Sequence, residues 1–230
     1  MNTIHKNIDK RLDKLARHPI GGPTMWTVAN CLTIIRIFIS PIFLLIYLQH
    51  DSFGITSKGL PYALLFLLSV SELSDALDGL LARKYNQVTD LGKILDPMAD
   101  SIYRISVFLT FTQPPVNVPL VFVFIFLYRD SVIGMLRTIC ALRGFALGAR
   151  PSGKIKAVLQ GISCFIIVLL LIPHSLGHLS NQALTAISSW CVVFTGLYAL
   201  YSGIEYLYAN RRHVQRVLIR NRKNATVAHD

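Results

Sequence analysis

The sequence predicts an all-α, polytopic membrane protein with six transmembrane helices, preceded by an amphipathic helix at the N-terminus. Hydrophobic residues make up 53% of the 230 residues, and the mean hydropathy is +0.49. Only 15% of the residues are charged, against about 25% in ordinary soluble domains. Apolar runs long enough to cross a bilayer recur along the chain between short polar breaks. These observations leave no room for a separate soluble domain of any size.

Residues 1–22 are polar and basic, and they form the first predicted segment. Four apolar residues in this segment recur at helical spacing: Ile4, Ile8, Leu12 and Leu15. With lysines elsewhere on the helical wheel, this pattern favours an amphipathic helix on the inner membrane surface. A disordered basic tail is the alternative. Gly21-Gly22-Pro23 ends the segment.

The membrane domain is predicted to span residues 23–210, and a basic tail, 211–230, follows it. Its six spans are expected at about Val28–Leu48, Leu60–Arg83, Leu91–Thr110, Val116–Leu142, Gly153–Ile172 and Gln182–Ala209.

The distribution of lysine and arginine predicts the orientation of these spans. Lys58 is the only one of the 23 basic residues in the three loops opposite the N-terminus. Both termini are therefore expected in the cytoplasm, where the polybasic tail would meet the anionic leaflet. Because orientation explains the net charge of +11, no nucleic-acid partner is expected. The four cysteines are scattered through apolar segments and indicate neither disulfides nor a zinc site.

The stretch from Asp75 to Asp100 carries the most informative pattern. Asp75 and Asp78 share a helical face, and so do Asp96 and Asp100. The residues between the two pairs are expected to reverse the chain, which would make the two helices antiparallel neighbours. Four converging carboxylates repel one another unless cations relieve the repulsion. Ligands that are all carboxylates favour Mg²⁺ or Mn²⁺, and two such ions form a clamp for phosphoryl-type chemistry.

Glycines flank these carboxylates. Gly79 and Gly92 would allow a nucleotide to approach the backbone closely, and Arg83 would pair with a phosphate or hold an aspartate. Arg36, about two turns into the first span, would face the aspartates or extend to the interface. The alternative for each aspartate is a solvated charge or a structural ion pair. That alternative explains the set less well, because ionisable residues in membrane segments are costly and usually functional.

A second group of charges is cationic. Arg129 and Arg137 share a helical face, and Lys154 and Lys156 open the fifth span. Cations gathered near buried carboxylates suggest a pocket for a phosphate-bearing substrate. Ordinary positive-inside charge is the alternative, and Arg143 and Arg150 are weaker candidates.

The stretch D-x2-D-G-x2-A-R-x8-G-x3-D-x3-D, from Asp75 to Asp100, resembles the signature of the CDP-alcohol phosphatidyltransferase family at every fixed position. The run Asn30 to Arg36 and the R-x…L-R…G-K-x-K pattern from Arg129 to Lys156 resemble its phosphatidylglycerophosphate synthase branch. This chain departs from the branch at three positions. Asp130 replaces the usual Glu, Ser101 the common Lys, and Glu72 a small or apolar residue.

The resemblance implies that residues 23–210 form a catalytic domain that transfers the phosphatidyl group of CDP-diacylglycerol to sn-glycerol 3-phosphate and releases CMP. It implies that two Mg²⁺ or Mn²⁺ ions bind Asp75, Asp78, Asp96 and Asp100, with Asp100 also acting as general base. The implied nucleotide-binding residues are Thr33, Gly79, Ala82, Arg83 and Gly92, and the implied acceptor-phosphate residues are Arg129, Arg137, Lys154 and Lys156.

The resemblance also implies a homodimer in membrane lipid, in a bacterial cytoplasmic membrane with the active site on the cytoplasmic side. Two alternatives stay open. The acceptor can be another alcohol, such as inositol phosphate, serine or phosphatidylglycerol. In a different class of protein, the aspartates would form the transport site of a divalent-cation transporter, which would not need Gly79, Ala82, Arg83 and Gly92 at fixed spacing.

Overall fold

A computed structural model describes residues 28–84, 90–142, 147–148 and 150–211, without the side chains of residues 28–32, 76, 78–84, 90–95 and 141–142. This part of the chain is all α-helical, as predicted. Its elements are α2 (Val28–Gln49), the 3₁₀ helix η1 (His50–Phe53), α3 (Leu60–Lys84), α4 (Asp90–Thr110), α5 (Leu120–Leu142), α6 (Pro151–Ser175) and α7 (Asn181–Ala209). The predicted helix in residues 1–22 and the predicted tail, apart from Arg211, lie outside the described residues.

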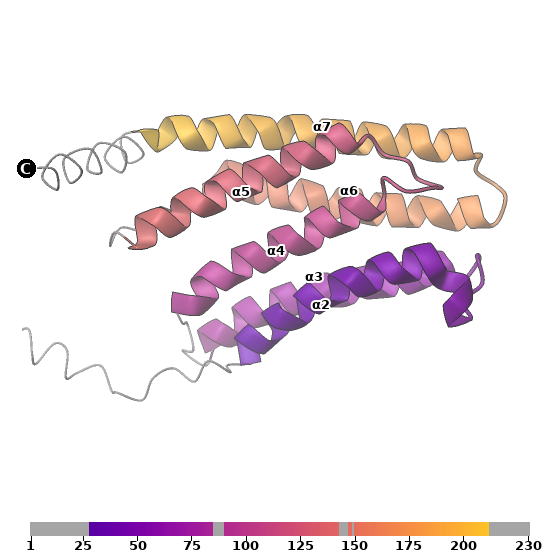
Figure 1. The fold of residues 1–230 in the computed structure, drawn as a ribbon, viewed down its shortest axis with the longest axis horizontal. Helices are drawn as coiled ribbons and strands as arrows, with labels where there is room; N and C mark the ends of the chain where they lie inside the picture. Colours follow the sequence, from indigo (N-terminus) through magenta and orange to yellow (C-terminus); the bar gives the residue numbers. More distant parts are fainter. Residues whose placement is uncertain (1–27, 85–89, 143–146, 149, 212–230) are drawn as a thin grey trace, which may run out of the picture.

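The six long helices run roughly alongside one another and alternate in direction (Figure 1). Helix α2 packs against α3 and α4, α3 packs against α6, and α4 packs against α5. Helix α7 packs against both α5 and α6. These contacts close a ring in the order α2, α3, α6, α7, α5, α4. In this ring, two packed pairs of helices, α3–α6 and α4–α5, separate α2 from α7.

Local sequence explains where the helices begin. Ser180 caps α7, because its side chain accepts a hydrogen bond from the Ala183 N–H. Helix α6 begins at Pro151, two residues before the prediction, since proline suits the first helical position. Helix α5 begins at Leu120 rather than at the predicted Val116. Pro119 immediately precedes it, and the residue before a proline is disfavoured in helical conformation.

Apolar side chains fill the interior and also cover the outside of the bundle. Phe43, Phe108, Phe111 and Phe126 are fully buried in one aromatic cluster. Large apolar side chains on the outer faces are exposed, among them Trp190 at 73%. An apolar exterior on an all-helical bundle is what a lipid environment requires.

Three helical segments in the described part of the chain are long and apolar enough to cross a membrane: Thr33–Phe53, Pro151–Ser175 and Asn181–Ala209. Helix α5 carries Arg129, Asp130 and Arg137 among its apolar residues. The crossing of the membrane by all six long helices stays a prediction.

Candidate functional site

The described carboxylates of the predicted metal site lie on two helices that both pack against α2. Asp75 lies on α3, and Asp96 and Asp100 lie one turn apart on α4. From α2, the buried Thr33 hydroxyl donates a hydrogen bond to Asp96 Oδ1 at 2.7 Å. Arg36 Nη1, also buried on α2, lies 2.9 Å from Asp75 Oδ1. One face of α2 therefore joins the carboxylates of α3 to those of α4.

A second buried arginine connects α3 and α4. Arg104, one turn after Asp100 on α4, donates from Nε to Asp100 Oδ1 at 2.8 Å. Its Nη2 lies 3.3 Å from Glu72 Oε2 on α3, and its Nη1 donates to the Ala157 carbonyl on α6 at 2.9 Å. In every described contact, the carboxylates of α3 and α4 meet arginines or the Thr33 hydroxyl, and not one another.

These side chains form the carboxylate region, which we define as Thr33, Arg36, Glu72, Asp75, Asp96, Asp100 and Arg104. Its described side chains include four carboxylates but only two arginines. The side chains of Asp75 and Asp100 are 45% and 27% exposed, so an ion can reach them. Carboxylate oxygens with an excess of negative charge fit a hard divalent cation.

The remaining residues of the predicted metal and nucleotide site cannot be placed at the level of side chains. Asp78, Gly79, Ala82 and Arg83 lie in α3, and Gly92 lies in α4, but the surroundings of these five residues lie outside the described part of the structure. Among the side chains that are described, no three Asp, Glu, His or Cys residues gather as a metal site. The four-carboxylate site with Asp78 stays a prediction. Thr33, which we expected to contact the nucleotide, lies on Asp96.

The predicted cations lie on α5 and α6, and two of them share a buried counter-ion. Lys156 Nζ on α6 lies 2.9 and 2.7 Å from the two carboxylate oxygens of Asp130 on α5. Arg129 Nη1 lies 2.8 Å from Asp130 Oδ1, and Arg129 Nη2 donates to the Ser202 hydroxyl on α7. Arg129 also passes Gly203, where an added Cβ would lie 3.0 Å from Arg129 Cγ. Asp130 thus links Arg129 on α5 to Lys156 on α6, and Arg129 extends this network to α7 through Ser202.

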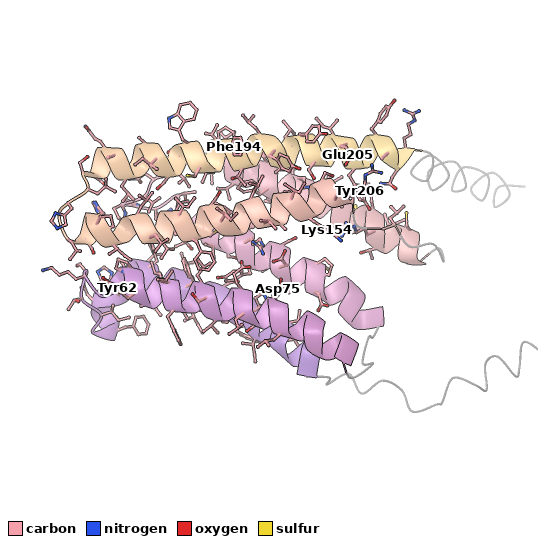
Figure 2. All side chains as sticks on the ribbon, turned by 180° about the vertical axis from the view of Figure 1, so that it is seen from behind. Tyr62, Asp75, Lys154, Phe194, Glu205 and Tyr206 are labelled. Atoms are coloured by element: carbon pink, nitrogen blue, oxygen red, sulfur yellow. The ribbon has the colours of Figure 1, made fainter. Side chains whose placement is uncertain are left out.

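The other cations lie nearer the end of the bundle that holds the last residues of α7. Arg137 donates from Nε to the Tyr206 hydroxyl at 3.3 Å, with its guanidinium 5.4 Å from the centre of that ring. Arg150 Nη2 lies 2.6 Å from Glu205 Oε1, and the Ser152 hydroxyl donates to Glu205 Oε2. Lys154 is exposed. Figure 2 shows Lys154, Glu205 and Tyr206 near one another, away from Tyr62 at the opposite end.

We call this second set the cation region and define it as Arg129, Asp130, Arg137, Arg150, Lys154, Lys156 and Glu205. Its described side chains include five cations and two carboxylates, so positive charge is in excess. An excess of arginine and lysine donors fits a phosphate.

Helix α6 joins the two regions. Lys156 contacts Asp130 of the cation region, while the carbonyl of the next residue, Ala157, accepts a hydrogen bond from Arg104 of the carboxylate region. The two regions therefore meet at one depth along α6.

Sequence reasoning missed the roles of the residues that hold these charges in place. Arg104 and Glu72 form ion pairs across helices, and Asp130 and Glu205 serve as counter-ions. The spacing of four residues between Asp100 and Arg104 was a usable signal, because residues so spaced pair on a helix. No spacing along the chain indicates that Glu72 meets Arg104.

Four buried charged side chains inside apolar helices indicate an integral membrane protein with a polar centre: Arg36, Arg104, Asp130 and Lys156. The sequence model for CDP-alcohol phosphatidyltransferases matches residues 26–198. The chain belongs to this family, and it is an enzyme that transfers phosphate-containing groups.

Individual relatives cover most of the chain. It is 30% identical over 192 residues to the CDP-diacylglycerol–glycerol-3-phosphate 3-phosphatidyltransferase of Bacillus subtilis (strain 168), covering 81% of this chain and 96% of the relative. It is 30% identical over 194 residues to the cardiolipin synthase (CMP-forming) of Streptomyces coelicolor, covering 82% and 85%. A Rickettsia typhi protein with the same name as the Bacillus relative is 32% identical over 145 residues, covering 63% and 78%.

Proposed function

We propose that this protein transfers the phosphatidyl group of CDP-diacylglycerol to sn-glycerol 3-phosphate, giving phosphatidylglycerophosphate and CMP in phospholipid synthesis. The observation that carries the proposal is the junction of the two regions on α6, at Lys156 and Ala157. On one side, an excess of carboxylates would bind metal ions that hold the pyrophosphate of CDP-diacylglycerol. Beside it, an excess of lysine and arginine side chains would bind the phosphate of the acceptor. The names of the Bacillus and Rickettsia relatives support this choice of substrates.

In the proposed reaction, the free hydroxyl oxygen of glycerol 3-phosphate attacks the phosphorus that carries diacylglycerol. The bond from that phosphorus to CMP breaks, and Asp100 accepts the hydroxyl proton. Two Mg²⁺ or Mn²⁺ ions would supply charge stabilisation for the pyrophosphate and the leaving CMP. Asp75, Asp78, Asp96 and Asp100 would hold these ions, with Arg36 and Thr33 orienting Asp75 and Asp96.

In this proposal, the remaining predicted site residues bind the nucleotide of CDP-diacylglycerol and the phosphate of the acceptor. Gly79, Ala82, Arg83 and Gly92 are proposed to lie against the nucleotide, and Thr33 to lie at its edge while held on Asp96. Arg129, Arg137, Lys154 and Lys156 are proposed to bind the acceptor phosphate. Asp130 fixes two of these cations, which reduces the conformational entropy that binding would otherwise cost.

The proposed topology has six membrane spans, with both termini and the active site in the cytoplasm of a bacterial cell. In a chain whose native cysteines are replaced, a cysteine at Lys58 should react with a membrane-impermeant reagent only from outside. A cysteine at Gly148, which is exposed between α5 and α6, should react only after the inner face is opened. The reverse pattern would contradict the topology.

We also propose a homodimer, on the resemblance to the family, and a division into residues 1–22, the catalytic domain 23–210 and the tail 211–230. The molar mass of the detergent-solubilised protein tests the dimer. A mass equal to that of one chain would contradict it.

The experiment that tests the function is CMP release from CDP-diacylglycerol by the purified wild-type protein with a panel of acceptors. We expect release with glycerol 3-phosphate and little with serine or inositol 1-phosphate. Phosphatidylglycerol belongs in the panel because the Streptomyces relative is named a cardiolipin synthase. A preference for any of these over glycerol 3-phosphate would overturn the proposed acceptor, and absence of CMP release with every acceptor would overturn the proposed reaction.

A further inference from the structure

Arg104 has a more constrained position than any role as a simple counter-ion requires. Its side chain is 7% exposed, and each of its three nitrogens has a partner on a different helix. Nε donates to Asp100 on α4, Nη2 lies near Glu72 on α3, and Nη1 donates to the Ala157 carbonyl on α6. A planar guanidinium with three fixed acceptors has one orientation.

The sequence of α6 provides space for this guanidinium. Ala157 and Gly161 are one turn apart on α6 and face Arg104. A Cβ on Gly161 would lie 2.9 Å from Arg104 Nη1 and 3.7 Å from Glu72 Oε1. Real Cβ atoms do not approach so closely, so any larger residue at this position moves the guanidinium. The absence of a side chain at Gly161 is therefore part of how Arg104 is held.

We propose that Arg104 is a positioning residue for Asp100, and that Glu72 and the Ala157 carbonyl hold Arg104 in the orientation that this role needs. The inference rests on the proposed function, in which Asp100 accepts the proton of the acceptor hydroxyl. Arg104 touches no reacting atom, and it acts through the carboxylate of Asp100.

The three-way contact determines how Arg104 meets Asp100. An arginine beside a single carboxylate tends to bind both carboxylate oxygens through two parallel hydrogen bonds. Here Glu72 and Ala157 take the two Nη groups, so only Nε is directed at Asp100, and it contacts Oδ1. Among the contacts of the described residues, Oδ2 of Asp100 is left to face the acceptor hydroxyl. In this proposal, Glu72 binds Arg104 Nη2 and so prevents Arg104 from binding both carboxylate oxygens of Asp100.

The sharpest test shifts the guanidinium without removing a charge. Gly161→Ala places a methyl group against Arg104 Nη1. Gly196→Ala on α7 is the matched control, because its Cβ would lie 2.5 Å from Phe122 Cδ1, away from Arg104. Both changes overpack a helix contact and should lower the thermal unfolding midpoint. We expect only Gly161→Ala to lower kcat, roughly tenfold, with KM for both substrates within about twofold of wild type, because misplacement of a catalytic group falls on the chemical step.

A second set of three variants separates positioning from charge. Arg104→Lys keeps a positive charge but cannot direct donors at all three acceptors. Its kcat should therefore be lower than that of the wild-type protein. Glu72→Ala should also lower kcat, because Arg104 becomes able to bind both oxygens of Asp100. Glu72→Gln keeps an acceptor for Nη2, so it should retain more activity than Glu72→Ala. Binding of CDP-diacylglycerol, measured without turnover, should be near normal in all three.

Three outcomes would contradict the positioning role of Arg104. Wild-type kcat in Gly161→Ala, or full activity of Arg104→Lys, would show that Arg104 only balances charge. Equal losses of kcat in Gly161→Ala and Gly196→Ala would show a general packing effect. Failure of the proposed function has a different signature, since the wild-type protein itself would then release no CMP with any acceptor, and the positioning role would be overturned with it.

Discussion

The carboxylate region and the cation region use the same chemical groups in opposite proportion. In the first, Arg36 and Arg104 hold Asp75, Asp100 and Glu72. In the second, Asp130 and Glu205 hold cations. Each region thus contains ion pairs that fix its geometry and a surplus of one sign. The comparison teaches that the ion pairs orient the charged groups of each region, while the sign of the surplus charge indicates the ligand.

Removal of divalent metal should have the largest effect on activity, because it acts on the carboxylate region alone. If the surplus carboxylates hold Mg²⁺ or Mn²⁺, CMP release should fall to background with EDTA and return when either metal is added in excess. Calcium and zinc additions at the same free concentration serve as controls for metal identity. Full turnover in metal-free buffer would show that the carboxylates have another role.

Asp100→Asn should have the next largest effect. A general base acts on the acceptor proton, so its loss should lower kcat by about 10²–10⁴-fold while CDP-diacylglycerol binding is largely retained. Asp75→Asn and Asp96→Asn should instead weaken binding of metal and CDP-diacylglycerol. Steady-state kinetics and equilibrium lipid binding on the same preparations separate the two patterns, and near-normal turnover of Asp100→Asn would assign the base elsewhere.

Removing one cation outside the Asp130 pairs should have a moderate effect on the acceptor alone. Charge-assisted hydrogen bonds contribute about 1.5–3 kcal/mol each, so Arg137→Ala or Lys154→Ala should raise KM for glycerol 3-phosphate roughly ten- to a hundredfold. Neither residue contacts Asp130 in the described structure, so these changes leave the buried pairs intact. An unchanged KM in both variants would remove them from the acceptor site.

The smallest expected effect distinguishes Lys156 from Lys154 by stability. Lys156 is buried on Asp130, whereas Lys154 is exposed. Lys156→Met should lower the free energy of unfolding by about 1.5–3 kcal/mol, less than the roughly 3–5 kcal/mol for an isolated buried charge, because Arg129 stays on Asp130. Lys154→Met should change it by less than about 0.5 kcal/mol. Unfolding in mixed micelles measures both, and equal values would contradict the distinction.

Sequence patterns predicted the helices well, because apolar runs and proline or glycine breaks are local features. Helix α5 begins a few residues later than predicted, because the segment before Leu120 is apolar enough to suggest helix whereas Pro119 disfavours it. The placement of Asp96 and Asp100 one turn apart on α4 was also predictable, because residues four apart share a helical face. Which faces of different helices meet depends on packing, and for this reason the contacts of Arg104 with Glu72 and Ala157 could not be predicted.

The departures from the family pattern illustrate the same limit. In the sequence, Glu72 stands out only as an unusual residue, and Asp130 only as a replacement for Glu. The structure gives each a specific partner, Arg104 for Glu72 and Lys156 for Asp130. A charge that looks out of place along one helix can therefore be the counter-ion of a charge on another.

The central claim, that the carboxylate region takes CDP-diacylglycerol and the cation region takes the acceptor, is tested most directly by measuring both substrates on one variant from each region. CMP release should be measured on Asp96→Asn and Arg137→Ala, with one substrate varied while the other is saturating. The account predicts that Asp96→Asn raises KM chiefly for CDP-diacylglycerol and Arg137→Ala chiefly for glycerol 3-phosphate. If each variant raised both KM values by the same factor, the two regions would be acting as one undivided site and the account would be contradicted.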